Sequence, residues 1–568
     1  MSMCGAVVQR RFWSFLVLCS VVTFAQLPPR CRRGDPCWPT EAEIAALRAS
    51  LDPAAPRNLV WPGGSSPRVC AVPYNSSGDQ PLYGAGKGLQ PMYVESNSDR
   101  ASTCFLDSFY PEYCLISTRN NPLEGWTPAF VVWPLSAEHV QVAVKFAADH
   151  NLGVCVAGTG HDFLNRHSCD QGLMIRTALM KGAKWSPDES ALQLGAGLTF
   201  SEAQSISSTR ARFVASGWSI TVGVVGWSLG GGHGPFGPSV GLGVDNLVAA
   251  ELVTADGSLV TVNDGGTTVR PLGSSQVKTS NDTSLLWALR GGGGSTWGVI
   301  TSLTVAAHPN PADGFTLGAL YWNGTMCGSD AERGSAFIDH YLDWSCTLDR
   351  RWAQLAYLTP TRAQPATGCP SVWSVFLYFV FQGTAADAAP TLAALTSKVP
   401  GSYVALPPTS VASWWDVESH QAAEYISPVA DLPRGVPSVV ISRDQVAGPD
   451  FRSILKSYLV QCNVSDADCH QFQLFQAVPG NTDSPHFDPA ATSISPGFRN
   501  AMMHVVTGVT DMAPLYKLAP NSYFSESLYN TSDWKQRFWG DNYDRLLDIK
   551  KQWDPEGRFW CNRCVGSD

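Results

Sequence analysis

The stretch VCVAGTGHDFLNRHSC, Val154 to Cys169, ends a short apolar run with a glycine-rich turn and a histidine. Val154 to Ala157 have the composition of a buried strand, and Gly158 and Gly160 interrupt it before His161. Directly upstream, AFVVWP has the character of a strand and LSAEHVQVAVKFAADHN has apolar residues at helical spacing. This order predicts a β-α-β unit that presents His161 at the end of its second strand.

A second glycine-rich stretch, TVGVVGWSLGGGHGPFG from Thr221 to Gly237, allows three interpretations. Gly232 to Gly237 fit the dinucleotide pattern GxGxxG, but Pro235 and the adjacent glycines oppose the helix that this pattern requires. Gly226 to Gly230 fit the GxSxG elbow of serine hydrolases, with Ser228 as nucleophile after TVGVV, which we expect to be a strand. The glycines after Ser228 disfavour the helix that the elbow needs, yet the hydrolase stays open as an alternative.

The third interpretation takes the glycines as a binding surface. Consecutive glycines let main-chain N–H groups approach a diphosphate closely, without a lysine. The two stretches would then line one extended dinucleotide. The cluster GGGGSTWG, Gly291 to Gly298, adds a third glycine segment, which makes simple turns a weaker explanation.

The region from Trp126 to His308 resembles the FAD-binding domain of the vanillyl-alcohol oxidase/p-cresol methylhydroxylase (PCMH-type) flavoproteins, and within them the berberine bridge enzyme-like oxidases of secreted fungal type. The segments GTGHDF, TVGVVGWSLGGGHG, GLGVDNLVAAELVTADG and LLWALRGGGGSTWGVIT carry the resemblance. The closing segment FWGDNYDRLLDIKKQWDPEGRFWC also matches, so the resemblance extends from Trp126 to the C-terminus.

The resemblance implies an α+β fold of two domains. A PCMH-type FAD-binding domain is followed by a second α+β domain for the substrate, in which helices cover an antiparallel sheet. The expected divisions are 1–25 for a signal peptide, 26–121 for an N-terminal extension, 122–308 for the FAD-binding domain, 309–520 for the substrate domain, and 521–568 for a C-terminal segment that returns to the first domain.

The resemblance also implies that His161 bonds covalently to the 8α-methyl group of FAD. Many relatives add a bond from a cysteine to flavin C6, in the segment that SGWSITVGVVGW matches. This chain has Ser219 there, and a serine alkoxide does not form at neutral pH, so we expect a single bond through His161. Cys155 and Cys169 flank the histidine and are expected to be buried or disulfide-bonded. The further expected FAD contacts are Gly158, Thr159, Gly160, Asp162, Thr221, Gly223, Gly226, Ser228, Gly230, Gly231 and Asn542.

The implied activity is that of an oxidase. An organic substrate gives hydride to FAD, and dioxygen reoxidises the flavin to yield hydrogen peroxide, in secondary metabolism or carbohydrate oxidation. A base that takes the hydroxyl proton of the substrate would assist, and the candidates are Tyr378, Tyr523, Glu526 and Tyr543. Relatives tend to have asparagine before the acidic residue where this chain has Ser525. We expect no metal, and a non-catalytic flavin-binding protein remains an alternative.

The N-terminus predicts secretion. Arg10 and Arg11 precede an apolar run from Phe12 to Ala25, which is shorter than the roughly 20 residues of a membrane span. The formal net charge of −9 and the lack of a long basic run argue against a nucleic-acid partner.

Cysteines and sequons agree with an oxidising compartment. Of the 16 cysteines, Cys4 and Cys19 lie in or before the predicted leader, which leaves an even number for disulfides. The close pairs Cys31/Cys37 and Cys561/Cys564 are expected disulfides, although CNRC alone also resembles a redox or zinc motif. The predicted glycosylation sites are Asn75, Asn281, Asn323, Asn463 and Asn530.

Overall fold

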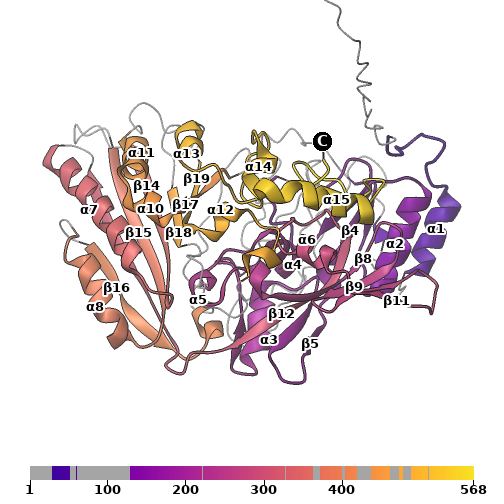
Figure 1. Cartoon of the computed structure of the whole chain (residues 1–568), viewed down its shortest axis with the longest axis horizontal. Helices are drawn as coiled ribbons and strands as arrows, with labels where there is room; N and C mark the ends of the chain where they lie inside the picture. The colour runs from indigo at the N-terminus through magenta and orange to yellow at the C-terminus, as the bar shows by residue number, and fades with distance from the viewer. Residues whose placement is uncertain are drawn as a thin grey trace, which may run out of the picture.

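Two lobes lie side by side in the computed structural model, and the C-terminal helices cover the first of them (Figure 1). The first lobe ends with strand β12, and the second begins with strand β13. The structure describes residues 29–51, 59–60, 128–164, 166–220, 222–325, 328–362, 371–399, 403–418, 436–460, 472–476, 488–508 and 511–567.

The first lobe opens with a small sheet of order β1-β2-β4-β3, whose last three strands run parallel. Helix α2 connects β2 to β3 and begins after Ser136, whose hydroxyl accepts the His139 N–H, so the predicted β-α-β unit is confirmed. Helix α1 starts with a capping box between Thr40 and Glu43 and packs on α2. The elements are α1 (Glu41–Ser50), β1 (Leu59–Val60), β2 (Phe130–Val132), α2 (Ala137–Asp149), β3 (Val154–Ala157) and β4 (Leu173–Arg176).

The second sheet of this lobe has eight strands in the order β11-β10-β9-β8-β12-β6-β5, with β7 also paired to β12. Strands β8 and β9 form an antiparallel hairpin with Asp256-Gly257 at its turn, where Gly257 has a φ of +80°. The strands are β5 (Ala183–Trp185), β6 (Ala191–Gly195), β7 (Arg212–Val214), β8 (Leu247–Val253), β9 (Leu259–Asn263), β10 (Gly266–Arg270), β11 (Lys278–Ser280) and β12 (Val299–Pro309). The helices are η2 (Thr177–Leu179), α3 (Phe200–Ser208), α4 (Val224–Gly230), α5 (Gly237–Val240), η3 (Gly243–Asn246) and α6 (Ser284–Leu289).

The expectation of a strand at TVGVV is wrong, because Val224–Gly230 form helix α4. Val224 and Leu229 are buried in the core of the lobe, and the ring of Trp227 packs 4.8 Å from that of Phe200. This tertiary packing overrides the β-propensity of the valines. Ser228 consequently lies inside a helix and is 2% exposed, so it is not at the strand-to-helix turn of a nucleophile elbow.

The second lobe is built on a seven-stranded antiparallel sheet of order β16-β13-β15-β14-β18-β19-β17. Helices α7, α8, α10 and α11 cover its outer face (Figure 1), and their apolar residues form one core with the sheet. This confirms the predicted α+β fold with a helix-covered antiparallel sheet. The strands are β13 (Phe315–Thr325), β14 (Trp352–Arg362), β15 (Ser371–Gln382), β16 (Tyr403–Val411), β17 (Ser438–Ser442), β18 (Phe472–Gln476) and β19 (Ala501–Thr507). The helices are α7 (Gly328–Thr347), α8 (Ala385–Thr396), α10 (Arg443–Ala447), α11 (Pro449–Val460), η6 (Pro489–Ala491), α12 (Pro496–Arg499) and α13 (Ala513–Leu518).

The C-terminal segment packs on the first lobe, where it appears yellow in Figure 1. It comprises α14 (Trp534–Trp539), η7 (Gly540–Asn542) and α15 (Tyr543–Trp553), and α15 ends immediately before Asp554-Pro555. Its buried side chains share one core with those of α4 and α6. The chain therefore leaves the first lobe, completes the second, and returns.

The two expected pairs, Cys31–Cys37 and Cys561–Cys564, form disulfides, and Cys155 and Cys169 form a third with each other. Cys346 is a free, half-buried thiol. Of the sequons, Asn281, Asn323 and Asn530 are exposed, whereas Asn75, Asn463 and the leader 1–25 lie outside the described residues. Among the described helices, none has the length and apolar character needed to cross a membrane.

Candidate functional site

Three glycine loops of the first lobe meet at one place. The Gly223 N–H donates to Thr159 Oγ1 at 3.0 Å, which joins the second loop to the first. The Gly293 N–H donates to the Leu229 carbonyl at 2.9 Å, which joins the third loop to the second. The sequence predicted that loops one and two line one ligand, and the fold brings them together with the third. We call them the glycine loops and define them as residues 158–162, 223–232 and 291–298.

Part of this surface is open to a ligand. A Cβ on Gly226 would meet no atom within 4 Å, and a Cβ on Gly294 would meet only the Gly226 Cα, at 3.9 Å. A Cβ on Gly158 would likewise touch its nearest atoms only at 3.9 Å. Since side chains here would project into free space, protein packing does not explain the glycines. The open strip fits a cofactor that lies directly on main chain, as a dinucleotide diphosphate does.

His161 follows Gly160, whose φ of +85° turns the chain at the end of β3. Asp162 shapes this turn, because its Oδ1 accepts the N–H groups of Leu164 and Arg166. Its Oδ2 accepts from the Arg166 guanidinium at 3.1 Å. The carboxylate of Asp162 is thus engaged in shaping the loop that carries His161, and the disulfide between Cys155 and Cys169 closes the same loop.

Arg166 connects the His161 loop to the C-terminal segment. Its guanidinium donates to the Phe524 carbonyl at 3.0 Å and to Ser527 Oγ at 3.0 Å, and it lies 4.1 Å above the ring of Phe524. The side chain is 3% exposed, so these contacts satisfy a buried charge. Residues 524–527 are therefore fixed relative to His161.

Several other predicted cofactor residues serve contacts within the protein. A Cβ on Gly230 would lie 2.4 Å from Ser525 Oγ, and one on Gly231 would lie 3.0 Å from the Tyr523 ring. The lack of a side chain at both glycines thus leaves room for Ser525 and Tyr523 of the C-terminal segment. Asn542 donates from Nδ2 to the Ser493 and Ile494 carbonyls. Ser228 is buried inside α4, and Thr221 lies outside the described residues.

A buried polar group adjoins the second glycine loop. His233 Nε2 lies 3.3 Å from Glu526 Oε1, and His504 Nε2 lies 3.2 Å from Glu526 Oε2. The side chains are 8%, 0% and 20% exposed for His233, His504 and Glu526. Tyr523 adjoins the group, since its hydroxyl accepts the Gly232 N–H at 3.1 Å and its ring lies 5.2 Å from that of His233. We call His233, His504 and Glu526 the His–Glu–His cluster.

Burial controls the charge of this group. It lowers the pKa of His504 to about 3, with His233 lowering it further and Glu526 opposing. Burial would raise the pKa of Glu526, but the neighbouring histidines outweigh it and hold the pKa below its usual value. Burial raises the pKa of Tyr523 to about 12. Near neutral pH the group therefore contains a carboxylate, a neutral His504 and an intact phenol.

Of the four predicted base candidates, the structure brings two together, Tyr523 and Glu526. Tyr378 lies on β15, where its ring packs 5.9 Å from that of Trp218. Tyr543 belongs to the core of the C-terminal helices, and its hydroxyl accepts the Gly566 N–H. This packing favours a structural role for Tyr543, and its role as a base stays a prediction.

His233 and His504 are not among the site residues predicted from the sequence. His233 stands within the second quoted stretch, directly after Gly232, so its position beside the glycines was an available signal. His504 is a single polar residue in the buried strand AMMHVVT, where a histidine is otherwise difficult to distinguish from a core residue.

Aromatic and aliphatic side chains from both lobes pack next to this cluster. Phe163 follows the His161 loop, and Trp218 precedes the second glycine loop, whereas Tyr357 and Phe475 come from strands β14 and β18. The Phe475 ring packs 5.0 Å from that of His233. The side chains in this group are Phe163, Trp218, Leu355, Tyr357, Val436, Phe475 and Val506.

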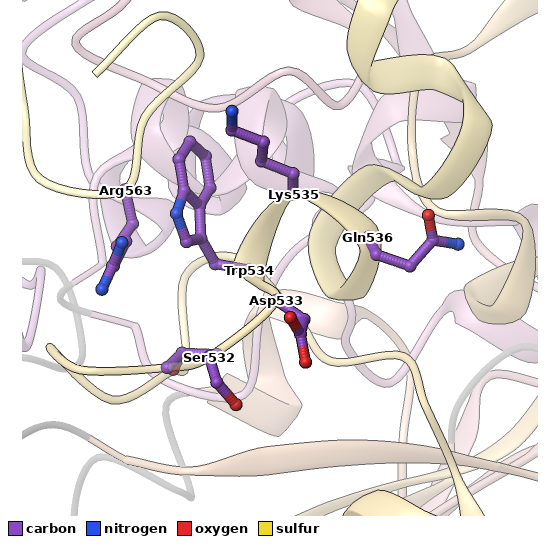
Figure 2. Close-up of a pocket in the computed structure, with 7 residues that line it drawn as sticks. Ser532, Asp533, Trp534, Lys535, Gln536 and Arg563 are labelled. Carbon is purple, nitrogen blue, oxygen red and sulfur yellow. The ribbon is translucent and has the colours of Figure 1, made fainter. Parts of the chain in front are cut away.

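A separate surface pocket lies on the C-terminal segment, and Figure 2 shows its lining. Trp534 forms one wall, with Arg563 and Lys535 on either side of it. The pocket contains none of the predicted cofactor or base residues. It is lined by Thr531, Ser532, Asp533, Trp534, Lys535, Gln536 and Arg563.

Comparison with known families identifies what the loops hold. A family model described as an FAD binding domain matches residues 128–263, and one described as berberine and berberine like matches residues 502–566. The chain is similar to the berberine bridge enzyme-like FAD-linked oxidoreductases, whose two family models match it. The first match contains the first two glycine loops, and the second contains His504, Tyr523 and Glu526. The serine hydrolase alternative finds no support in this family or in the buried position of Ser228.

Relatives of this oxidoreductase align over nearly its whole length. The FAD-linked oxidoreductase malF of Malbranchea aurantiaca is 29% identical, with 95% of this chain and 92% of that protein covered. The VAO-type flavoprotein MtVAO615 of Myceliophthora thermophila C1 has a similar fold, with a TM-score of 0.68, 22% identity, and 95% and 97% of the two chains covered. Glucooligosaccharide oxidase of Acremonium strictum matches with a TM-score of 0.61 at 18% identity, over 80% of this chain and 94% of that one.

Proposed function

We propose that this FAD-linked oxidoreductase is a secreted oxidase that holds its flavin through one covalent bond, from His161. The observation that carries the proposal is the open glycine strip of Gly158, Gly226 and Gly294, which begins beside His161. When bound, FAD would accept hydride from a substrate C–H bond and pass the electrons to dioxygen, giving hydrogen peroxide.

The residues proposed to hold the cofactor are His161 and the main chain of the glycine loops. The Acremonium oxidase is described as having a 6-S-cysteinyl, 8α-N1-histidyl FAD, which is a bond to a cysteine and a bond to a histidine. This chain offers a histidine at the end of β3 but an exposed Ser219 before the second glycine loop. Cys155 and Cys169 are joined to each other, so neither is a free thiolate near His161. These facts favour a single histidyl bond.

The proton of the substrate hydroxyl is proposed to leave through the polar group beside the second glycine loop. Glu526 is ionised there and is oriented by His233, and Tyr523 lies within the same group. A carboxylate held by a neighbouring imidazole is suited to accept a proton as hydride departs.

The substrate is proposed to be an aromatic or otherwise apolar secondary metabolite rather than a carbohydrate. A sugar presents several hydroxyl groups, each of which needs a hydrogen-bond partner once buried. Leu355, Val436 and Val506 next to the cluster supply none, whereas Phe163, Trp218 and Phe475 can pack against a flat ring. Secretion is proposed from the leader sequence and from the exposed positions of Asn281, Asn323 and Asn530.

The test is peptide mapping of the denatured holoenzyme. The protein should stay yellow after acid precipitation, and one tryptic flavopeptide should contain His161 with no cysteine peptide attached. His161→Ala should release the flavin on precipitation, whereas the control Ser219→Ala should retain it. Two peptides on the flavin, or a flavin that washes off the wild type, would contradict the single bond.

Oxidase activity is tested by a substrate panel of phenolic and alicyclic alcohols beside oligosaccharides, read as peroxide release and flavin bleaching. We expect bleaching and peroxide with the apolar alcohols. Activity on oligosaccharides alone would overturn the substrate class. A bound flavin that no compound bleaches would favour a non-catalytic flavin-binding protein.

A further inference from the structure

The His–Glu–His cluster has the composition of a metal site. The ligand atoms of His233, His504 and Glu526 all lie within 4.8 Å of one another. Two imidazoles and one carboxylate, with a further position left open, form the ligand set of catalytic zinc sites and of some iron sites. Neighbouring ligand atoms around a tetrahedral zinc ion lie about 3.3 Å apart. The two measured imidazole-to-carboxylate separations are 3.3 and 3.2 Å.

The hydrogen bond between His233 and Glu526 Oε1 accounts for only part of the arrangement. His504 has no exposed side-chain surface, and neither of its ring nitrogens has a hydrogen-bond partner within the described residues. Its Nε2 is near Glu526 Oε2, but the two atoms are not aligned for a hydrogen bond, and Oε2 also lacks a described partner. Buried polar atoms are normally satisfied. An ion between the three side chains would satisfy His504 Nε2 and Glu526 Oε2 together.

The main chain holds two of the ligands rigidly. His504 lies on β19, where it pairs with Phe475 of β18 on one side and Val440 of β17 on the other. Glu526 is held by Ser438 of β17, whose hydroxyl donates to the Glu526 carbonyl at 2.6 Å. Both ligands are thus attached to neighbouring strands of one sheet.

The third ligand is fixed from the other lobe. Trp227 Nε1 donates to the His233 carbonyl at 2.9 Å, and Gly232 donates to the Tyr523 hydroxyl. Metal sites need ligands that are positioned before the ion arrives, and these two hydrogen bonds help to position His233 in this way.

We infer that His233, His504 and Glu526 bind one divalent transition-metal ion of the Zn²⁺ class beside the flavin site. The inference goes beyond the proposed function, because hydride transfer to FAD needs no ion. An ion with an open position would take a substrate oxygen and lower the pKa of a bound hydroxyl, which would assist the proton loss proposed above. The other described group of this kind, Cys31, Asp35 and Cys37, offers no thiolate because its cysteines form a disulfide.

The experiment uses the full-length, flavin-loaded protein and Zn²⁺ as the probe. The protein is stripped with EDTA, incubated with ZnCl₂, dialysed, and analysed for zinc and flavin per chain by mass spectrometry and absorbance. Calorimetric titration with Zn²⁺ gives the affinity. The variants are Glu526→Gln and His504→Gln, which keep side-chain size, and the control is His308→Gln, which removes a histidine bonded to Asn246 in the first lobe.

We expect about one zinc per chain in the wild type and in the His308→Gln control. Each ligand variant should bind zinc at least about 100-fold more weakly, while both variants keep their flavin. A yellow wild-type protein with less than a tenth of a zinc per chain would overturn the inference and leave the flavin proposal standing. Zinc retained equally by the ligand variants would also overturn it, because the ion would then lie elsewhere.

Discussion

The glycine loops and the His–Glu–His cluster adjoin each other, yet they are assembled in opposite ways. Each glycine loop is one short run of sequence, and one glycine in each, Gly158, Gly226 or Gly294, leaves free space beside the main chain. The cluster joins residues separated by as many as 293 positions, from both lobes and the C-terminal segment. The comparison shows that main-chain binding can be recognised locally, whereas a site made of single side chains is apparent only after folding.

The largest expected effect concerns glycines that serve packing rather than ligand. A Cβ on Gly234 would lie 1.9 Å from the Ser216 carbonyl oxygen, which is main chain and cannot rotate away. We expect Gly234→Ala to lower the free energy of unfolding by at least about 3 kcal/mol. Thermal unfolding measures it, with Gly182→Ala as control, since a Cβ there meets no atom within 4 Å. Equal melting of the two variants would show that the loop adapts.

A smaller effect is expected for Glu418, whose surroundings, like the cluster, come from both lobes. Its partner Ser216 lies in the first lobe, whereas Glu418 itself lies in the second. Burial raises the pKa of Glu418 to about 8, with hydrogen bonds from Trp414 and Ser216 opposing. The unfolded chain has a pKa of about 4.3, so the native state binds the extra proton between these values. The free energy of unfolding should therefore fall as pH rises, by on the order of 2 kcal/mol from pH 5 to 8.

Glu418→Gln should remove that slope, because the amide has no proton to lose. Denaturant unfolding of both proteins at pH 5, 6.5 and 8 measures it, with the exposed Asp541→Asn as control. Parallel pH profiles for wild type and Glu418→Gln would show that the carboxyl is already solvated.

The smallest expected effect tests whether Gly226 faces the flavin or other atoms of the protein. Gly226→Ala places a methyl in the open strip of α4, and alanine is more favourable than glycine in a helix by about 1 kcal/mol. Stability without flavin should hold or rise, while flavin retention should weaken at least about tenfold. The ratio of absorbance at flavin and protein wavelengths reports it, again against Gly182→Ala. Full flavin loading in Gly226→Ala would remove this glycine from the cofactor surface.

Features set by a few consecutive residues could be predicted from the sequence. The Asp256-Gly257 hairpin, the Ser136 and Thr40 caps and the disulfide at Cys561 depend on neighbours in the chain. The two-domain α+β fold followed from the resemblance that the glycine motifs and the closing segment carried.

Features decided by distant packing could not be predicted in this way. TVGVV resembles a strand until Phe200 and the α4 core are present. Tyr543 is a candidate base from the sequence alone, which does not reveal that its hydroxyl accepts from Gly566. The position of His504 becomes significant only because the C-terminal segment places Glu526 beside β17. In each case the deciding partner lies far away along the chain.

The Cys155–Cys169 disulfide has a consequence for making the protein. It closes a loop of 14 residues around His161, and closing a loop of that size removes roughly 3 kcal/mol of chain entropy from the open form. The disulfide therefore has to form before the loop can hold His161 in a fixed position. A host cytosol keeps thiols reduced and so prevents this disulfide from forming. The amount of bound flavin would then report whether the chain was folded in an oxidising compartment.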